Sequence, residues 1–253
     1  MLKTRVMPCL LLRNKGLVKT VKFKNPNYIG DPINTIRIFN EKEIDELILL
    51  DITATTGNKK PNFQIISEVA SECFMPLTYG GGIRSIEDAR MIFSLGVEKI
   101  AVNSYAVENP AFVKEMAGLF GNQSVIIAID VKKKWLGKYV VCAHGGGNTT
   151  KHEPVEWAKY MEEMGAGEIL LTSIDRDGTY EGYDIELIQR VTASVTIPVI
   201  TCGGAGKVTD FTEAVKVGGA SAVAAGSMVV YQGKKRGVLI NFPARQELET
   251  ALP

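Results

Sequence analysis

The sequence predicts an α/β protein: a single (β/α)8 TIM barrel spanning residues 1–253 and built from two similar half-barrels, about 1–124 and 125–253. The first observation is an internal repeat, because the stretch 30–48 returns 122 residues later as 152–170. The second is a glycine cluster after Pro76 that returns after Pro198 at the same offset. A period this long is not that of a solenoid, whereas roughly 250 residues is the usual size of one such barrel.

Eight short apolar runs alternate with longer segments of helical period, as expected for a parallel sheet that is buried on both faces. The predicted strands are residues 5–12, 46–52, 76–79, 99–103, 125–131, 168–174, 198–202 and 221–225. Helix starts are indicated by Asp31 and Asn109, each followed by a proline, and by Ser85 with an acidic residue three positions on. Eight units favour a closed barrel over an open doubly wound sheet, the other architecture that this alternation allows.

Composition excludes several classes of function. Lys and Arg number 29 against 28 Asp and Glu, so the net charge of +1 gives no general attraction for nucleic acid or a membrane surface. Four cysteines without a C-x-x-C pair, and no signal-like start, indicate a reduced, cytoplasmic protein. The sequence has no run of about 20 apolar residues. Its two histidines, His144 and His152, lack neighbours at metal-ligand spacing, so neither a metal nor a cofactor is predicted.

Two segments interrupt the alternation, residues 13–27 and 131–150, and each follows the first strand of a half. We expect both to be loops over the mouth, meaning the end of the barrel where the strands finish and where such barrels build active sites. The lysines at 15, 22 and 24 are interpreted as a solvated hairpin edge. Lys19 is the exception, and we expect it at the site.

The glycine clusters predict two anion sites. Gly81-Gly82 and Gly203-Gly204 each lie between a strand and a helix start, so backbone N–H groups and a helix N-terminus can face one phosphate. Small residues end two further strands, namely Asn103-Ser104 and Gly226-Ser227. A single cluster would be explained by a tight turn, whereas a matched pair favours phosphate binding.

Acidic residues at strand ends are candidates for chemistry, since a carboxylate there lies beside a bound substrate. They are Asp51, Asp130, Asp175 and Asp177. Asp130 is the preferred catalytic group; the alternative interpretation is a loop cap or a partner for the lysines at 132–134. Asp175, next to an arginine, is interpreted as structural.

The opposite ends of four strands carry two positive and two negative residues, Arg5, Glu46, Lys99 and Glu168, which we call the floor ring. Buried at the barrel floor, these charges have to pair with one another, because an isolated buried charge is very costly. Such a paired ring is either a static plug or a gate.

Several motifs occur together and in a specific order. They are Val6-Met7-Pro8-Cys9-Leu10, Gly30-Asp31-Pro32, Asp45-Glu46-Leu47, Tyr79-Gly80-Gly81-Gly82-Ile83, Ala128-Ile129-Asp130-Val131, Gly165-Ala166-Gly167-Glu168, Ser173-Ile174-Asp175-Arg176-Asp177-Gly178-Thr179 and Gly203-Gly204-Ala205-Gly206. Over nearly its whole length the chain resembles the HisF family, the cyclase (lyase) subunit of imidazole glycerol phosphate synthase in histidine biosynthesis. That family is a TIM barrel of duplicated halves. A separate HisH-like glutaminase docks at its floor and passes ammonia through the charged ring.

The resemblance implies roles at the matching positions. It makes the floor ring an ammonia gate, Gln123 a docking-face residue and Asp130 one of two catalytic aspartates. The residues implied in binding phosphate or other parts of a substrate are Asp51, Gly81, Gly82, Asn103, Ser104, Thr172, Asp177, Gly178, Gly203, Gly204, Gly226 and Ser227.

Two departures from the family pattern point to a divergent branch. Leu11 stands where the family has its other catalytic aspartate, and Met228 stands where a histidine usually follows the second phosphate site. With the segment after Cys9, these departures resemble the paralogues associated with amidation of sugars in surface polysaccharides. The resemblance implies a glutaminase partner, an ATP-using ligase-like partner, and a phosphorylated or nucleotide-linked substrate, with Asp130 and Lys19 at the mouth. The alternatives are a genuine cyclase and a noncatalytic ammonia-channel scaffold.

Overall fold

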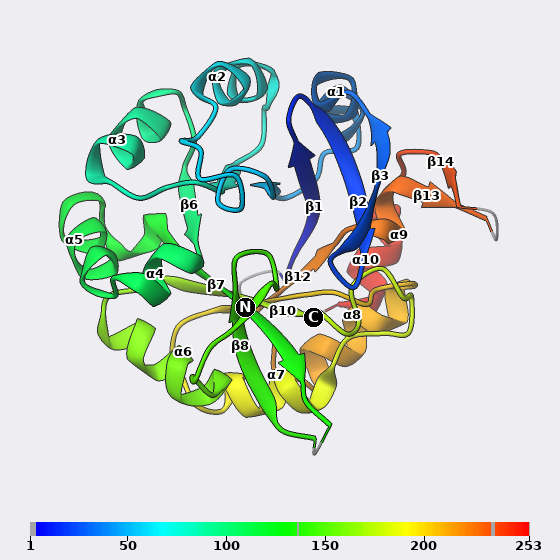
Figure 1. The fold of residues 1–253 in the computed structure, drawn as a ribbon. Coiled ribbons are helices and arrows are strands. Elements are labelled where there is room, and N and C mark those ends of the chain that lie inside the picture. Colours follow the sequence, from blue (N-terminus) through cyan, green and yellow to red (C-terminus); the bar gives the residue numbers. More distant parts are fainter. Residues whose placement is uncertain (1–3, 136, 234–235, 253) are drawn as a thin grey trace.

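The computed structural model describes residues 4–135, 137–233 and 236–252. Eight parallel strands close into a barrel, because β10 pairs with β11 on one side and with β7 on the other (Figure 1). The barrel strands are β1 (Arg5–Arg13), β4 (Leu47–Asp51), β5 (Leu77–Gly80), β6 (Lys99–Val102), β7 (Val125–Lys133), β10 (Glu168–Ser173), β11 (Val199–Cys202) and β12 (Ala222–Ala225). The predicted (β/α)8 barrel is therefore confirmed, and the open sheet is excluded.

Helices surround the strands (Figure 1). They are α1 (Pro32–Glu41), α2 (Phe63–Glu72), α3 (Ile86–Ser94), α4 (Ser104–Glu108), α5 (Ala111–Phe120), α6 (Pro154–Glu163), α7 (Ile185–Thr192), α8 (Val208–Lys216), α9 (Ser227–Val230) and α10 (Arg245–Ala251), with a 3-10 turn η1 (Asn122–Ser124). Asp31 and Ser85 cap α1 and α3 as predicted, since each side chain accepts a backbone N–H of the first turn. A helix, α5, does begin beside Asn109, but the capping residue differs from the prediction: Pro110 occupies the N-cap position of α5, and Asn109 is the C-cap of α4.

Alternation along the barrel strands separates two apolar layers. One face of each strand packs against the helices, in a large core that includes Leu10, Phe39 and Tyr79. The other face fills the barrel interior with a smaller cluster. On β1 the interior face carries Arg5, Met7, Cys9 and Leu11 in turn, so one strand runs from the charged floor through an apolar middle to the mouth.

The two halves repeat each other in geometry as well as in sequence. Asn103 and Gly226, which precede α4 and α9, have φ/ψ values of −121°/−83° and −104°/−86°. Gly81 and Gly82 have φ of 124° and 74°, and their counterparts Gly203 and Gly204 have φ of 91° and 117°. Both glycine clusters therefore use backbone conformations that other residues rarely adopt.

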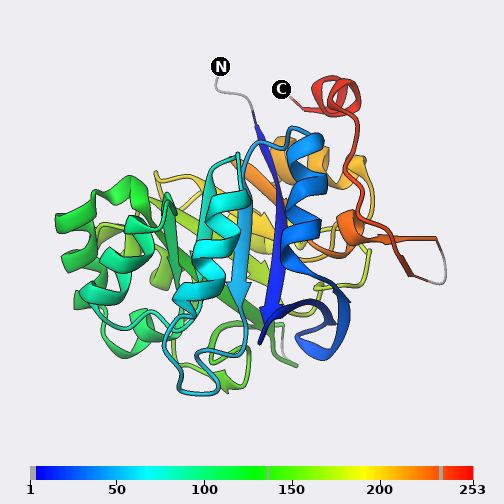
Figure 2. The ribbon, with the colours of Figure 1, turned by 90° about the horizontal axis from the view of Figure 1, so that it is seen from above.

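The two interrupting segments lie at the mouth as predicted, but they are strands rather than loops. Residues 16–30 form β2 (Gly16–Val21) and β3 (Lys24–Gly30), and β7 continues through a turn into β8 (Tyr139–Ala143) and β9 (Asn148–Thr149). A shorter hairpin, β13 (Tyr231–Gln232) with β14 (Gly237–Val238), follows α9. Figure 2 shows β1 entering from the face that bears both termini, with the β2–β3 hairpin at the opposite face.

No helix among the described residues is long and apolar enough to cross a membrane.

Candidate functional site

One cavity of about 290 Å³ opens at the mouth of the barrel. Every residue that was predicted for catalysis or phosphate binding lines it. These residues are Lys19, Asp51, Gly81, Gly82, Asn103, Ser104, Asp130, Thr172, Asp177, Gly178, Gly203, Gly204, Gly226 and Ser227. The strand ends and the β2–β3 hairpin thus gather side chains that lie more than 200 residues apart in the chain.

Lys19 on β2 is buried, with 5% of its surface exposed. Its ammonium group donates to the backbone carbonyl of Cys9 inside the barrel. A Cβ on Gly226 would lie 2.3 Å from Lys19 Nζ, so the glycine leaves room for this lysine. The interpretation of the other hairpin lysines as solvated agrees with their exposure, and Lys19 is the exception that we expected.

Asp130 at the end of the barrel section of β7 accepts a hydrogen bond from Asn103 Nδ2 at 2.9 Å. Burial and, to a smaller extent, the nearby Asp177 charge raise its pKa while a hydrogen bond from Thr172 lowers it, and together they bring the pKa from 3.8 to about 7. No described lysine forms an ion pair with it; Lys133 instead contacts Glu186. A carboxyl group with a pKa near neutrality can both accept and donate a proton, which supports Asp130 over its structural alternatives.

The other strand-end carboxylates organise the mouth. Asp51 Oδ1 accepts from Thr53 N, Thr53 Oγ1 and Ala54 N at 2.7–3.1 Å, so it caps the loop after β4. Asp177 Oδ2 accepts from Thr20 Oγ1 at 2.8 Å and from Phe23 N at 3.3 Å, which fixes the β2–β3 hairpin over the cavity. Asp175 accepts from Lys133 N at 2.7 Å, in agreement with the structural role inferred for it.

The glycine cluster of the first half has a neighbouring contact that the sequence did not predict. Ser104 Oγ accepts the backbone N–H of His144 at 2.8 Å, and His144 Nε2 lies 3.2 Å from Glu108 Oε1. The glycine turn after β8 is thereby attached to α4, and Gly145 reaches the cavity wall. The sequence contains no signal for this contact, because it joins residues 40 positions apart through a backbone group.

Tight packing at the second-half site makes a prediction about Gly204. Its φ is +117°, and a Cβ would lie 2.1 Å from the carbonyl oxygen of Gly182. We expect Gly204→Ala to lower the free energy of unfolding by about 2 kcal/mol, measured by urea denaturation, because the backbone has to move. Gly118→Ala is the matched control: nothing lies within 4 Å of that Cβ, and the helix should gain about 0.5–1 kcal/mol. Equal stability of the two variants would contradict this assignment.

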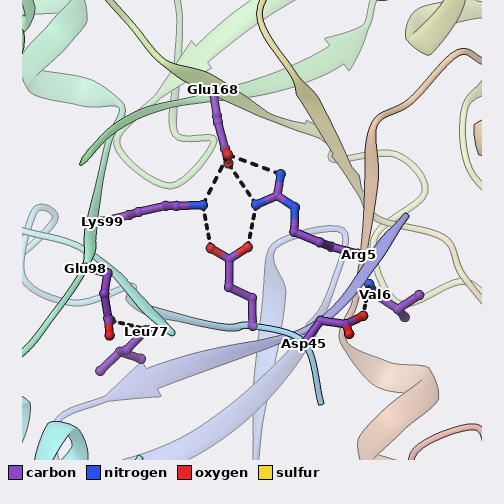
Figure 3. Close-up of polar contacts among 8 residues, drawn as sticks. Arg5, Val6, Asp45, Leu77, Glu98, Lys99 and Glu168 are labelled. Carbon is purple, nitrogen blue, oxygen red and sulfur yellow. Dashed lines mark hydrogen bonds and ion pairs between the residues drawn. The ribbon is translucent and has the colours of Figure 1, made fainter. Parts of the chain in front are cut away.

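The floor ring is complete and cyclic (Figure 3). Arg5 contacts Glu46 at 2.5 Å and Glu168 at 3.2 Å, and Lys99 contacts the same two carboxylates at 2.5 and 3.1 Å. Each cation therefore bridges both anions, and the charges balance. Of the four side chains, Glu46 is the most buried, at 5% exposure.

Further carboxylates at the floor satisfy backbone groups where strands begin. Asp45 Oδ2 accepts from Val6 N at 3.0 Å, and Glu98 Oε2 accepts from Leu77 N at 2.7 Å (Figure 3). Gln123 lies exposed on η1, just before β7, and donates to Phe120 O at 3.3 Å. Its position is on the floor side, and its docking role stays a prediction.

Among the described residues, no three His, Cys, Asp or Glu side chains are arranged to hold a metal ion. The four cysteines carry free thiols. What the cavity offers is backbone N–H groups, one buried ammonium and one carboxyl group of raised pKa. These groups suit a polar, anionic small molecule and a proton transfer.

The fold and site define a class: a (β/α)8 barrel with a substrate cavity at its mouth and a paired ionic ring across its floor. The histidine biosynthesis protein family matches residues 5–236, and the chain belongs to it as a HisF-type subunit. A relative from Pseudomonas aeruginosa named "Putative imidazole glycerol phosphate synthase subunit hisF2" is 52% identical over 249 residues, 98% of this chain and 99% of that one.

Two further relatives cover similar lengths. A similarly named HisF subunit from Leptospira interrogans is 50% identical over 250 residues, 98% of each chain. The "Imidazole glycerol phosphate synthase subunit HisF" of Alkaliphilus metalliredigens is 44% identical over 231 residues, 91% of this chain and 92% of that one. The resemblance inferred from the motifs is confirmed.

Proposed function

We propose that the chain is the ammonia-using barrel subunit of a two-component glutamine amidotransferase that serves amidination of a sugar for surface polysaccharide. A HisH-like glutaminase docks at the floor, near Gln123, and releases ammonia there. The barrel carries the ammonia to the mouth, where a phosphorylated or nucleotide-linked sugar substrate is amidinated with the help of an ATP-using partner. The observation that supports divergence from the cyclase is that Leu11 lines the cavity, at the position where the family resemblance implies a catalytic aspartate.

The interior supports passage of a neutral molecule. Above the floor ring the barrel interior is filled by apolar or sulfur-bearing side chains, namely Met7, Cys9, Ile48, Ala101, Ile126, Leu170, Ile200, Cys202, Ala222 and Ala224. Neutral ammonia crosses such a lining at little cost, whereas an ammonium ion there loses its hydration. The ring is the polar obstacle on this path, and moving one of its long cationic side chains would open it. We therefore favour a gate over a static plug as the function of the floor ring.

The mouth supports chemistry on the delivered nitrogen. When ammonia attacks a carbon centre, its nitrogen has to lose a proton, and Asp130 is a base of suitable pKa at that place. Lys19 presents a positive charge to the same cavity. The glycine sites of both halves offer backbone N–H groups to phosphate. A side chain such as Leu11 supplies no proton, so a reaction that needs two carboxylic acids is disfavoured.

The decisive experiment incubates the purified chain with an ammonium salt and the ribulosyl intermediate of the imidazole pathway. We expect turnover about 10²- to 10⁴-fold below that of an enzyme with both acids, and we expect Leu11→Asp to recover part of that factor. Leu50→Asp, one strand away and also lining the cavity, is the control. Turnover by the unaltered chain at a rate typical of the family would establish the cyclase instead.

A further inference from the structure

The mouth hairpins differ in charge from the rest of the chain. Residues 13–30, 131–149 and 231–243 carry five, four and three Lys or Arg, and no Asp or Glu. The remainder therefore carries 17 basic residues against all 28 acidic ones, although the whole chain is nearly neutral. The basic excess is concentrated where the cavity opens, and a field of this kind attracts an acidic surface.

Most of these charges are free to meet a partner. The exposed basic side chains in the described parts of the hairpins are Arg13, Lys15, Lys22, Lys24, Lys132, Lys133, Lys134, Lys138 and Arg236. Among them, the described structure contains an ion pair only for Lys133, which contacts Glu186 at 3.0 Å. A protective role at an edge strand explains the lysines beside β3. Those on the β7–β8 hairpin lie beyond Val131, where β7 is paired with β8 alone, and they flank the hairpin tip.

Trp135 at the tip of the β7–β8 hairpin is 99% exposed, the most exposed large apolar residue of the described chain. Trp is rarely so exposed in a monomer, and it is enriched where binding energy concentrates in interfaces. Two backbone hydrogen bonds flank it: Lys134 N donates to Lys138 O and Gly137 N donates to Lys134 O, both at 2.8 Å. These bonds join the described chain on either side of the tryptophan, whose side chain is open to solvent.

The same hairpin is continuous with the reaction site. Asp130 on β7 lines the cavity, and Trp135 follows five residues later, on the order of 15 Å away along the strand direction. At the base of the hairpin, Tyr139 OH donates to Asp184 Oδ1 at 2.9 Å, which ties β8 to the start of α7. A protein bound at Trp135 would thus lie beside the open cavity.

We infer that the mouth hairpins form a docking surface for an acidic face of the ATP-using partner enzyme, with Trp135 buried in that face. This inference rests on the proposed function, which places that partner at the mouth. A protein is favoured as the occupant of this surface over an anionic membrane, because a lipid surface does not react with ammonia. Basic rim charges accelerate association with an acidic partner, and a central aromatic side chain slows its release.

The first experiment places the photo-crosslinker p-benzoylphenylalanine at position 135 in the native cell. The control position is Val217, an exposed residue that follows α8 on the floor side. We expect the ATP-using partner enzyme, identified by mass spectrometry, to cross-link at 135 and not at 217. Cross-linking of only other proteins at 135, equal cross-linking of that enzyme at both positions, or no cross-link at 135 overturns the inference.

The second experiment measures affinity between the purified cross-linked protein and the barrel. Trp135→Ala should weaken binding at least tenfold, and reversal of Lys132, Lys134 and Lys138 to Glu should weaken it at least a hundredfold. Binding of the unaltered chain should weaken as NaCl rises from about 50 to 500 mM. Lys216→Glu, at the floor end of α8, is the charge control and should have no effect. Thermal melts confirm folding, since exposed tip substitutions change stability little.

Other occupants give distinct results. Binding of the barrel to phosphatidylglycerol vesicles in a Trp135-dependent manner, or Trp135-dependent dimers in light scattering, would assign the surface to a membrane or to a second copy and overturn the inference. Glutamine-supported amidation is assayed separately. Docking without amidation contradicts the proposed function alone, whereas amidation that is unchanged in the Trp135 and lysine variants contradicts the docking surface alone.

Discussion

Glu46→Gln is expected to lower the free energy of unfolding by about 3 kcal/mol and to uncouple glutamine hydrolysis from use of its ammonia. Glu46 is nearly buried and accepts from both cations of the floor ring at 2.5 Å. Its loss leaves Arg5 and Lys99 sharing the single carboxylate of Glu168, so one positive charge is uncompensated. Urea denaturation measures the stability. In the complex with the glutaminase, product formation from glutamine should fall more than product formation from an ammonium salt.

The matched control for this change is Glu43→Gln. Glu43 is 80% exposed and lies 4.0 Å from the exposed Arg245, so solvent screens the pair and its removal should leave stability nearly unchanged. It lies on the same side of the barrel, before β4, so it tests charge removal without breaking the ring. If Glu46→Gln matched this control in both stability and coupling, the ring would be neither a structural closure nor a gate.

Asp130→Asn is expected to reduce the rate of amidation by about 10²- to 10⁴-fold, the usual effect of removing a positioned acid or base. The amide keeps the shape of the side chain but accepts no proton. Because the pKa of Asp130 is about 7, activity of the unaltered protein should rise with pH through neutrality as the carboxylate forms. The residual activity of the variant should lack that step. A pure ammonia conduit would tolerate the change, so full activity in the variant would establish the scaffold alternative.

The same carboxyl group makes stability depend on pH. Its pKa is 3.8 when unfolded and about 7 when folded, so between these values the folded state binds more protons. The contribution of this group to stability is therefore complete below about pH 4 and is lost as pH rises through the folded-state pKa of about 7. Asp130→Asn removes this loss, so at pH 8 the variant should be more stable than the unaltered chain by roughly 2 kcal/mol. This value is smaller than the free energy that corresponds to the full pKa shift, because Asp130 borders the cavity and solvent there screens its charge.

Asp31→Asn is the control for both effects of Asp130→Asn. Asp31 caps α1 at an exposed position, and asparagine caps a helix equally well. We expect no change in activity and no new pH dependence of stability. Melting temperatures measured at pH 5 and at pH 8 distinguish the two variants. Only Asp130→Asn should change the difference between the melting temperature at pH 5 and that at pH 8.

Much of the fold was predictable because it depends on local patterns. Alternation and the helical segments between the runs located all eight barrel strands, with ends that differ by a few residues from the observed ones. The helix starts at Asp31 and Ser85 were predictable from capping chemistry, whereas Asn109 was not, because a second short helix occupies the preceding residues. The hairpins over the mouth were predicted as loops, since their pairing depends on partners that a local pattern does not reveal.

Within the site, the sequence predicted which residues lie at the strand ends, but it did not predict which groups they contact. Period 2 along β1 places Arg5 and Leu11 on the same interior face, at opposite ends of the barrel. By contrast, Asp177 holds a hairpin 154 residues away, and Ser104 accepts from His144. These bonds follow from the packing of loops against one another.

The amino-acid sequence alone determined the duplicated barrel, the two glycine sites, the four charges of the floor and the absence of an acid at Leu11, because spacing and residue chemistry express each of these directly. Only the tertiary structure decided that those four charges close into one ring, that Lys19 lies against Cys9 beneath a hairpin, and that Asp130 titrates near neutrality. The physical reason is that pairing and burial are properties of groups from distant parts of the chain, and they exist only once the barrel has brought those groups together.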